Sequence, residues 1–413
     1  MAADLSRIIF SLAERVVEIQ ERLISCKALA PSNGGLGELE KARYIETQLE
    51  QLGIEFTRFD SPDPMAEEGV RPNIVARIGG KKRRYLWLFA HMDVVPAGDV
   101  KAWTGSPWEI RREGDFLFGR GVEDNQQAIV SMLVLAEAIK KSGIEPETGL
   151  GLVFLADEEC GSGHGMKWLL ERTPRFFNRE DFFIVPDGGS EDAAEIEIAE
   201  KGQLWLKITV KGKQSHASMP HLGNNAFLGA SQLVLALQSL YRFFPQRNEL
   251  FNPPFSTFVP TRHEENVAAI NIMPGKEVFY LDCRIIPELD FGLIIKKATE
   301  IADEVARILK LGIEIETVQE QKPTSVSPNS PVTRALEKAI LKIYGVNARP
   351  VGIGGATVAA FLREKGFPAV VWSCLLGTCH QPNERSSITA SLKDAAVFGE
   401  IITARDDGDR HAS

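Results

Sequence analysis

Histidines and carboxylates follow four short apolar segments of the chain, close to the point where each segment ends. After LWLFA, GLGLVFLA, FFIVP and AVVWSCLL come, in turn, His91 and Asp93, Asp157 to Glu159, Asp187, and His380. A single acid after a strand more often caps a helix or faces solvent in a turn. Several acids that converge on one edge repel one another and need a counter-charge. The pattern therefore predicts a divalent metal site.

The types of side chain restrict the metal. Histidine and carboxylate ligands without cysteine suit zinc, cobalt or manganese, and the number of acids is sufficient for two ions. The pair His91 and Asp93 also has the spacing at which an aspartate can fix the orientation of a ligand imidazole. We therefore expect two divalent ions, with zinc as the first choice and cobalt or manganese as alternatives.

The elements that must position these residues alternate between helix and strand. Residues 85–91, 149–156 and 182–185 are short apolar runs typical of buried strands, while residues 39–53 and 127–143 have helical periodicity. This alternation predicts an α/β layer with crossover helices. In such sheets ligands bind at the carboxyl ends of the strands, where the polar residues lie.

The pattern changes near Gln203 and returns near Ser325. Between them the sequence predicts strands at 204–212 and 276–286 and helices at 225–241 and 291–312, an α+β order; afterwards a helix at 331–345 and a strand at 367–376 resume the α/β pattern. We therefore expect a mixed-sheet α/β catalytic domain, residues 1–202 and 322–413, with an α+β domain, residues 203–321, inserted into it.

Composition excludes several classes of protein. The 413 residues are 44% hydrophobic and carry a net charge of −9, which argues against the broad basic face that non-specific nucleic-acid binding requires. The segment 1–26 is predicted to be an amphipathic helix and not a signal peptide, and the longest uncharged apolar stretch, 367–380, is too short to span a bilayer. We expect a cytoplasmic protein with no membrane or nucleic-acid partner, disordered only in its last residues, 404–413.

Seven motifs occur in an order that resembles a known family. They are AHMDVVPAGD, W-x-x-x-P-W, GRGVEDNQQAIV, FLADEECGS, VPDGG, GKQSHASMPHLGNNAF and HQPNE. Together they resemble the co-catalytic zinc peptidases and amidohydrolases, a family that includes succinyl-diaminopimelate desuccinylase, acetylornithine deacetylase, aminoacylase and carboxypeptidase G. The resemblance covers nearly the whole chain. It implies that the inserted segment is a lid and dimerisation domain and that the protein is a homodimer.

The resemblance also assigns metal ligands. It implies His91 and Asp187 as terminal ligands of one ion, Glu159 and His380 as terminal ligands of the other, and Asp124 as the bridge between them. Glu123, beside Asp124, is the competing candidate for the bridge. The family pattern places the bridge at the sixth position of GRGVED, which is Asp124.

Further roles follow from the same motifs. The resemblance implies that Asp93 orients His91, that Glu158 is the general base, and that His216 donates a hydrogen bond to the developing oxyanion across a dimer interface. It places Asn271, Arg284 and the loop at Gly354 and Gly355 against the substrate, with Arg284 suited to a carboxylate. The chain departs from the family's Gly-Gly-Thr/Ser loop, because Ala356 stands before Thr357.

The substrate stays open at this point. An aspartate at position 187, where a glutamate is the alternative, resembles the amino-, di- and tripeptidases. The length of the chain and the sequences of its motifs resemble the desuccinylases and deacetylases. We expect hydrolysis of an amide bond in an N-acyl amino acid or short peptide, with a di- or aminopeptidase, or a non-catalytic metal-binding relative, as alternatives. A nucleotide-binding interpretation would depend on glycine-rich loops without a GK[ST] ending, which is weak.

Overall fold

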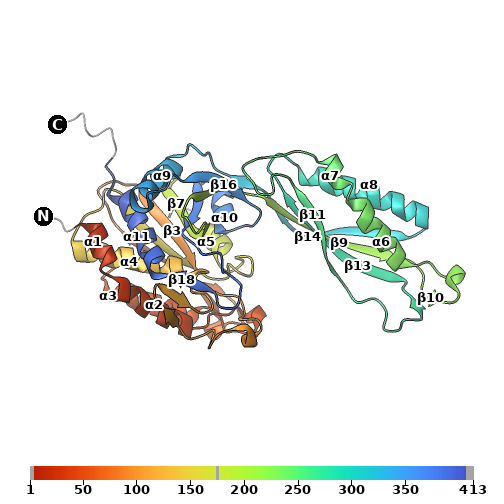
Figure 1. Ribbon diagram of the computed structural model, residues 1–413, viewed down its shortest axis with the longest axis horizontal. Helices are drawn as coiled ribbons and strands as arrows, with labels where there is room; N and C mark the ends of the chain where they lie inside the picture. The colour runs from red at the N-terminus through yellow and green to blue at the C-terminus, as the bar shows by residue number, and fades with distance from the viewer. Residues whose placement is uncertain (1–3, 174–175, 406–413) are drawn as a thin grey trace. The chain divides into compact units, whose positions relative to one another are not determined.

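The computed structural model describes residues 4–173 and 176–405 of the chain. Residues 406–413, most of the tail for which the sequence predicts disorder, lie outside that range. The chain divides into two compact units, Met1–Ile198 with Val326–Val351 and Thr357–Ser413, and Ala199–Ser325 with Gly352–Ala356 (Figure 1). The sequence predicts boundaries at 203 and 321 and places the glycine-rich loop at 354–355 in the first unit, whereas that loop groups with the second.

A mixed sheet forms the centre of the first unit. Its strands follow the order β1-β2-β6-β3-β7-β17-β8. They are β1 (Phe56–Pro62), β2 (Val70–Ile78), β3 (Tyr85–His91), β6 (Gly149–Leu155), β7 (Phe182–Gly189), β8 (Glu195–Glu200) and β17 (Ala369–Ser373). Strands β6, β3, β7 and β17 are parallel to one another. Strand β2 pairs antiparallel with β1 and β6, and β8 pairs antiparallel with β17. The predicted α/β class is confirmed.

Both faces of this sheet are covered, which explains its continuous apolar strands. From β3, Trp87 and Phe89 enter a buried cluster with residues of α5 (Met166–Arg172) and α10 (Val358–Glu364). Leu86 and Leu88 alternate with them and therefore point to the other face, where α4 (Gln126–Ser142) packs on β3 and α11 (Ile388–Thr403) packs on α4. Complete burial of each such side chain contributes about 1.5–3 kcal/mol.

The other helices of the first unit begin and end at recognisable signals. Helix α9 (Pro331–Tyr344) starts after Ser330, whose hydroxyl accepts a hydrogen bond from the Thr333 N–H, and ends at Gly345, which has a φ of 74°. Helix α3 spans Leu39–Gln51, and a small sheet contains β4 (Arg111–Glu113), β5 (Phe116–Phe118) and β18 (Arg385–Ser387). Within the described part of the chain, no helix combines the length and apolar character needed to cross a membrane.

The N-terminal segment differs from the prediction of one helix. It forms α1 (Leu5–Phe10) and α2 (Ala13–Ser25), separated at Ser11 and Leu12. The Ser11 hydroxyl donates to the carbonyl of Ile8 at 2.6 Å, and Leu12 has φ −97° and ψ 24°, outside the helical range. A serine that bonds back to the preceding turn favours such a break, a local effect that hydrophobic periodicity does not report.

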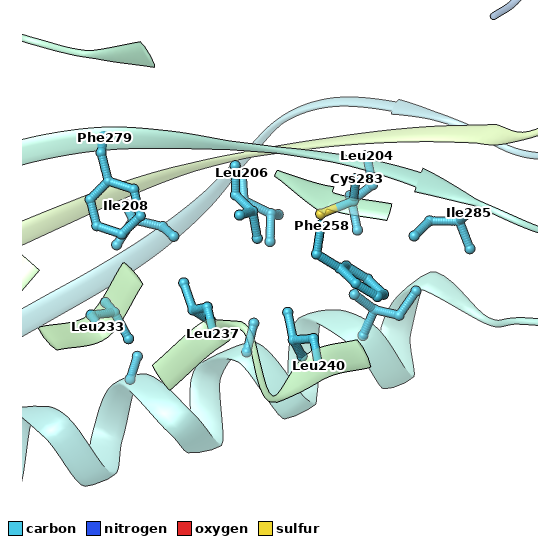
Figure 2. Packing of buried hydrophobic residues seen from close by; sticks show 14 of the residues in the cluster. Leu204, Leu206, Ile208, Leu233, Leu237, Leu240, Phe258, Phe279, Cys283 and Ile285 are labelled. Atoms are coloured by element: carbon cyan, nitrogen blue, oxygen red, sulfur yellow. The ribbon is translucent and has the colours of Figure 1, made fainter. Parts of the chain in front are cut away.

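The second unit is an antiparallel sheet in the order β11-β13-β9-β14, with helices packed on one side (Figure 1). Its strands are β9 (Gly202–Lys211), β11 (Thr257–His263), β13 (Lys276–Ile285) and β14 (Gly312–Gln321); its helices are α6 (Ala226–Leu237), α7 (Leu240–Phe243) and α8 (Phe291–Leu309). Figure 2 shows the core, in which Leu206 and Ile208 of β9 meet Leu233 and Leu237 of α6. A separate two-stranded antiparallel sheet pairs β10 (Ser215–His216) with β12 (Ile272–Met273).

Candidate metal centre and active site

The parallel strands bring the polar residues of four separate segments to one edge. His91 is the last residue of β3, Glu158 and Glu159 follow β6, and Asp187 lies near the end of β7. His380 lies in the loop after β17, which is parallel to β7. Carboxyl ends of parallel strands meet at the same sheet edge, so residues up to about 290 positions apart in sequence become neighbours here.

Two groups of side chains at this edge have the spacing of metal sites. His91, Asp124 and Asp187 form one group and Asp124, Glu159 and His380 the other, and within each group one ligand atom per residue lies within 4.8 Å of the others. The Asp124 Oδ1 atom is 2.9 Å from His91 Nε2, and its Oδ2 atom is 3.1 Å from His380 Nε2. The His380 Nε2 atom is also 3.1 Å from Glu159 Oε1. Asp124 thus presents one oxygen to each histidine, the arrangement expected of a bridging carboxylate.

The electrostatics of the group fit divalent cations. Burial lowers the pKa of His91, but the carboxylates of Asp187 and Asp124 outweigh it and hold that pKa well above its usual value. Hydrogen bonds with Asp124 and Glu159 raise the pKa of His380 to about 10. The carboxylates therefore favour positive charge at this place. Two divalent ions with nitrogen and oxygen ligands would balance them in the same place, so the donor set fits a two-metal centre.

Asp93 connects the first histidine to the glutamates. The His91 Nδ1 atom lies 3.0 Å from the backbone carbonyl of Asp93 and 3.4 Å from its carboxylate. A carbonyl only accepts, so Nδ1 carries the proton and Nε2 has its lone pair free in the neutral ring. The two oxygens of the buried Asp93 carboxylate accept the N–H groups of Glu158 and Glu159, each at 3.0 Å. Asp93 therefore positions both the imidazole of His91 and the turn that carries the two glutamates.

The neighbours Glu123 and Asp124 have separate functions. The buried Glu123 carboxylate accepts hydrogen bonds from the N–H groups of Leu376, Gly377 and Thr378 and from the Thr378 hydroxyl. It therefore holds the loop after β17 that carries His380. Asp124 is the member of the pair that faces both histidines.

Two residues without an assignment from the sequence also position this edge. Glu384, the last residue of the HQPNE motif, accepts the N–H groups of Gly121, Glu123 and Asp124 at 3.0–3.1 Å and pairs with Arg120 at 2.5 Å. The HQPNE motif could have indicated Glu384, but the family resemblance assigns a role only to its histidine, His380.

Asn125 is the second such residue. Its side-chain NH₂ donates to the carbonyl of Pro186 at 2.8 Å and to Asp187 Oδ1 at 2.7 Å. Its oxygen accepts the His91 N–H at 3.3 Å. Asn125 thus couples the ends of β3 and β7, and only its place beside Asp124 in the sequence could have indicated this.

A buried network supports the turn of Glu158 from the opposite side. Asp157 has a left-handed φ of 61° and its N–H donates to Glu38 at 3.2 Å. Arg71 forms a bidentate pair with Glu38 and lies 3.4 Å from Asp157. The sequence favours a structural role for Asp157, and these contacts are structural ones. Neither Arg71 nor Glu38 stands out in the sequence.

The predicted substrate residues of the second unit lie near one another in two pairs. His216 pairs with Ile272 in the two-stranded sheet of β10 and β12, next to Asn271, whose carbonyl accepts the Ala217 N–H at 2.9 Å. The His216 Nδ1 atom accepts the Ser218 N–H at 3.1 Å, which leaves the proton of the neutral ring on Nε2. Both His216 and Asn271 are exposed.

The second pair is Arg284 and the glycine loop. The Arg284 Nη1 atom donates to the carbonyl of Gly354 at 3.2 Å, beside Gly355. The same guanidinium binds both oxygens of Asp282, at 2.8 and 3.1 Å. This intrastrand pair was not anticipated, and a carboxylate ligand of Arg284 would have to compete with Asp282.

Cys379 beside His380 does not form a nucleophilic pair. Burial, followed by the charge of Asp124 and Glu123, raises the pKa of the Cys379 thiol to about 12. A thiol that keeps its proton is a poor nucleophile. The chemistry of this edge therefore belongs to the carboxylates and histidines.

Comparisons with known proteins identify relatives of this chain over most of its length. The model of the peptidase family M20/M25/M40 matches residues 87–404. An uncharacterized metallohydrolase of Methanocaldococcus jannaschii is 36% identical over 407 residues, 95% of this chain and 99% of the relative. A succinyl-diaminopimelate desuccinylase of Psychromonas ingrahamii is 27% identical over 376 residues, 90% of this chain and 94% of the relative.

A solved structure shows the same fold. The crystal structure of a tripeptidase from Staphylococcus aureus matches with a TM-score of 0.77 at 18% identity and covers 95% of this chain and 98% of that one. The segment that the family model matches contains every residue named above for the metal centre. The predicted resemblance is confirmed: this chain is a hydrolase of amide bonds that belongs to the peptidase family M20/M25/M40.

Proposed function

We propose that the protein hydrolyses the amide bond of an N-acyl amino acid or short peptide with a water molecule activated between two metal ions. The observation that carries the proposal is the position of Asp124, which presents one carboxylate oxygen to His91 and the other to His380. Glu158 stands in a turn that Asp93 ties to the same histidine.

The residues that would hold the metals are those of the two groups. His91 and Asp187 would bind one ion, Glu159 and His380 the other, and Asp124 both. We propose zinc as the native ion, because imidazole nitrogen and carboxylate oxygen are suitable ligands for it, with cobalt or manganese as substitutes. When bound, such a pair lowers the pKa of a shared water and polarises the scissile carbonyl.

Glu158 would transfer the proton. Burial, followed by the neighbouring acids Asp187 and Glu159, raises the pKa of Glu158 well above its usual value despite the opposing effect of His91. A carboxylate with a raised pKa can take a proton from water at neutral pH and return it to the leaving nitrogen. Asp93 would keep Glu158 at the distance that both transfers require.

Residues of the second unit would bind the substrate. His216 holds Nδ1 as an acceptor of the Ser218 N–H, so its Nε2–H would be free to donate to the oxyanion of the transition state. Arg284 would bind a substrate carboxylate in exchange for Asp282. Asn271, Gly354 and Gly355 would complete this surface.

We also propose a homodimer formed through the second unit. Helix α6 leaves Phe227, Leu228 and Leu235 exposed, at 56%, 60% and 74%, on one side of the helix. Exposed apolar side chains that cluster in this way favour a protein interface. Sedimentation equilibrium would find a dimer that Leu235→Glu converts to monomers; a monomeric wild type would contradict the proposal.

Activity is tested on metal-free protein reloaded with zinc, cobalt or manganese. The panel contains N-succinyl and N-acetyl amino acids, dipeptides and tripeptides, so that the class of substrate emerges from the rates. Hydrolysis is expected only after metal addition, and Glu158→Gln should lose about 10²–10⁴-fold in kcat while two metals stay bound. Glu171→Gln, at an exposed glutamate, is the matched control.

Two results would contradict this function. One is a wild-type protein with two bound metals that hydrolyses no member of the panel, which would favour a metal-binding relative without catalysis. The other is a Glu158→Gln variant with wild-type kcat, which would move the proton transfer to a different residue.

A further inference from the structure

Basic side chains gather at the edge of the first unit's sheet opposite the candidate metal centre. Two neighbouring hollows of about 320 and 560 Å³ lie there and share Arg84, Phe182 and Pro331. Their lining includes residues at the amino ends of the parallel strands: Arg84 before β3, Thr148 before β6, Phe182 at the start of β7, and Pro368 before β17. Since β3 ends at His91, the two edges are about 20 Å apart, seven residues of extended chain.

The charge of this region is opposite to that of the whole chain. Among the described residues, eight lysines and arginines line the two hollows against three acids, in a protein of net charge −9. Two of the acids are engaged within the fold. Asp181 accepts hydrogen bonds from Tyr85 N–H and Trp87 Nε1–H at 3.0 and 2.9 Å, and Glu400 pairs with Lys342 at 2.6 Å. The Glu400 pair also engages one of the eight cations, Lys342, and Arg405 lies 3.7 Å from Glu147, but the lining still contains more cations than acids.

Separate elements supply these cations. Helix α9 contributes Arg334, Lys338 and Lys342, which recur every four residues on one face of the helix. Loops contribute Arg83 and Arg179, and all five side chains are exposed. Helix α9 also begins at Pro331, in the wall that both hollows share, so the partial positive charge of its amino end adds to theirs.

We propose that these hollows bind a small anion that carries two or more phosphate groups. Like charges brought together from a helix and two loops repel one another, and a multivalent anion relieves that repulsion. Guanidinium groups match phosphate oxygens in pairs, and helix amino ends are common phosphate sites. The two volumes lie in the range of small-molecule sites. The site is separate from the proposed hydrolytic centre and does not depend on it.

The test measures binding of tripolyphosphate and of ATP to the full-length protein by calorimetry, with sodium sulfate and sodium chloride at equal ionic strength as comparisons. Tripolyphosphate should bind with a Kd below 1 mM and more tightly than sulfate, on the order of tenfold or more. The double variant Arg179→Glu/Arg334→Glu should weaken binding at least tenfold. The matched control Lys296→Glu/Arg307→Glu changes the same charge at exposed positions of α8 and should leave binding unchanged.

A separate arm excludes the metal centre as the binding site, because phosphates also bind metal ions. Asp124→Asn, which removes the proposed bridging ligand, should bind tripolyphosphate as the wild type does. ATP that binds as tightly as tripolyphosphate supports recognition of the phosphate chain alone. The proposal is overturned if neither anion binds more tightly than sulfate, if the two double variants lose affinity equally, or if Asp124→Asn abolishes binding.

Discussion

The two units support their candidate site residues to very different degrees. In the first unit, the Asn125 amide donates to a side chain of the candidate metal groups, and the carboxylates of Glu384 and Asp93 accept the backbone N–H groups of two further members. In the second unit, His216 and Asn271 are exposed at a small two-stranded sheet, and Arg284 is paired with Asp282 of the same strand. The candidate metal ligands are thus held by contacts within the fold, whereas the candidate substrate residues have fewer such contacts.

The largest effect should come from the residue common to both metal groups. Asp124→Asn removes one anionic ligand from each group. If the metals are lost, their Lewis-acid stabilisation of several kcal/mol is lost as well, which corresponds to about a thousandfold in rate. We expect neither ion to be retained and activity to fall at least that far. Metal content by mass spectrometry and kcat on the best substrate measure the two effects.

The matched control is the neighbouring glutamate. Glu123→Gln keeps the size of the side chain but replaces one acceptor oxygen with an NH₂ group, which cannot accept the N–H groups of the His380 loop. Such outer contacts typically change metal affinity about 10–100-fold, and only the ion bound by His380 should be affected. Equal loss of both ions in Asp124→Asn and Glu123→Gln would contradict the prediction that only the Asp124 carboxylate serves both metal groups.

The next largest effect tests the exposed region. His216→Ala should lower kcat about 10²–10³-fold through loss of an oxyanion donor, without loss of metal. Ser218→Ala keeps the backbone N–H that orients the ring and should change kcat little.

Mixing inactive variants then tests whether the second subunit supplies this residue. If His216 acts on the partner's metal centre, heterodimers of His216→Ala and Glu158→Gln contain one intact site of two. About a quarter of wild-type activity should return when the chains reassociate at random. An absence of recovery, with heterodimers present, would place His216 in the site of its own chain.

A smaller effect is expected from the buried pair Arg71 and Glu38, next to the turn that carries Glu158. Arg71→Met leaves Glu38 buried without its partner, which should destabilise the fold by about 3–5 kcal/mol. The double variant Arg71→Met/Glu38→Gln removes both charges and should recover much of that stability. If the pair positions Glu158, kcat stays about tenfold low in the double variant although metal content and Tm are near those of the wild type. Recovery of kcat together with Tm would leave the pair only a structural role.

The smallest effect concerns stability alone. Lys41 is buried, its Nζ atom has no hydrogen-bond partner among the described residues, and burial lowers its pKa to about 8. The unfolded chain keeps an ordinary lysine pKa, near 10.5, so the buried ammonium costs up to about 3 kcal/mol below pH 8, and this cost disappears between pH 8 and 10.5. Lys41→Met should therefore stabilise the protein at pH 7 and lose this advantage as the pH rises.

Urea unfolding at pH 7 and at pH 10 measures the change. The control Lys365→Met is at an exposed position and should have little effect at either pH. A Lys41→Met variant that is less stable than the wild type at pH 7 would show that the attraction of Lys41 for Asp93 and Glu38 outweighs its desolvation.

The fold class was accessible to sequence reasoning because the signals were strong and local. The run 85–91 coincides with β3, and the predicted helix at 331–345 coincides with α9, since apolar runs, caps and terminal glycines act within a few residues. The segment 1–26 was wrongly predicted as one helix, because a single serine-to-carbonyl hydrogen bond interrupts a pattern whose periodicity continues.

The site could be predicted only in part. His91, Glu159, Asp187 and His380 could be singled out because histidines and acids placed after parallel strands meet at one edge, where their charges need a cation. Asp124 follows none of these strands, and only the family resemblance indicated it. Asn125, Glu384 and Arg71 were missed because an amide, an acid in a loop and an arginine in a strand are common everywhere, and their roles depend on partners 33 to 263 positions away. The assignment of the individual ligand and base residues stays a prediction.

Four strands of the mixed sheet, β3, β6, β7 and β17, run in the same direction, and this also sorts the charges of the first unit. Acids collect where β3, β6, β7 and β17 end, and lysines and arginines collect where they begin. The unit consequently has an electric dipole along the strands that the net charge of −9 conceals. On a negatively charged support such as silica, the first unit should adsorb through its basic edge, so that immobilisation leaves the candidate metal centre accessible from the solution.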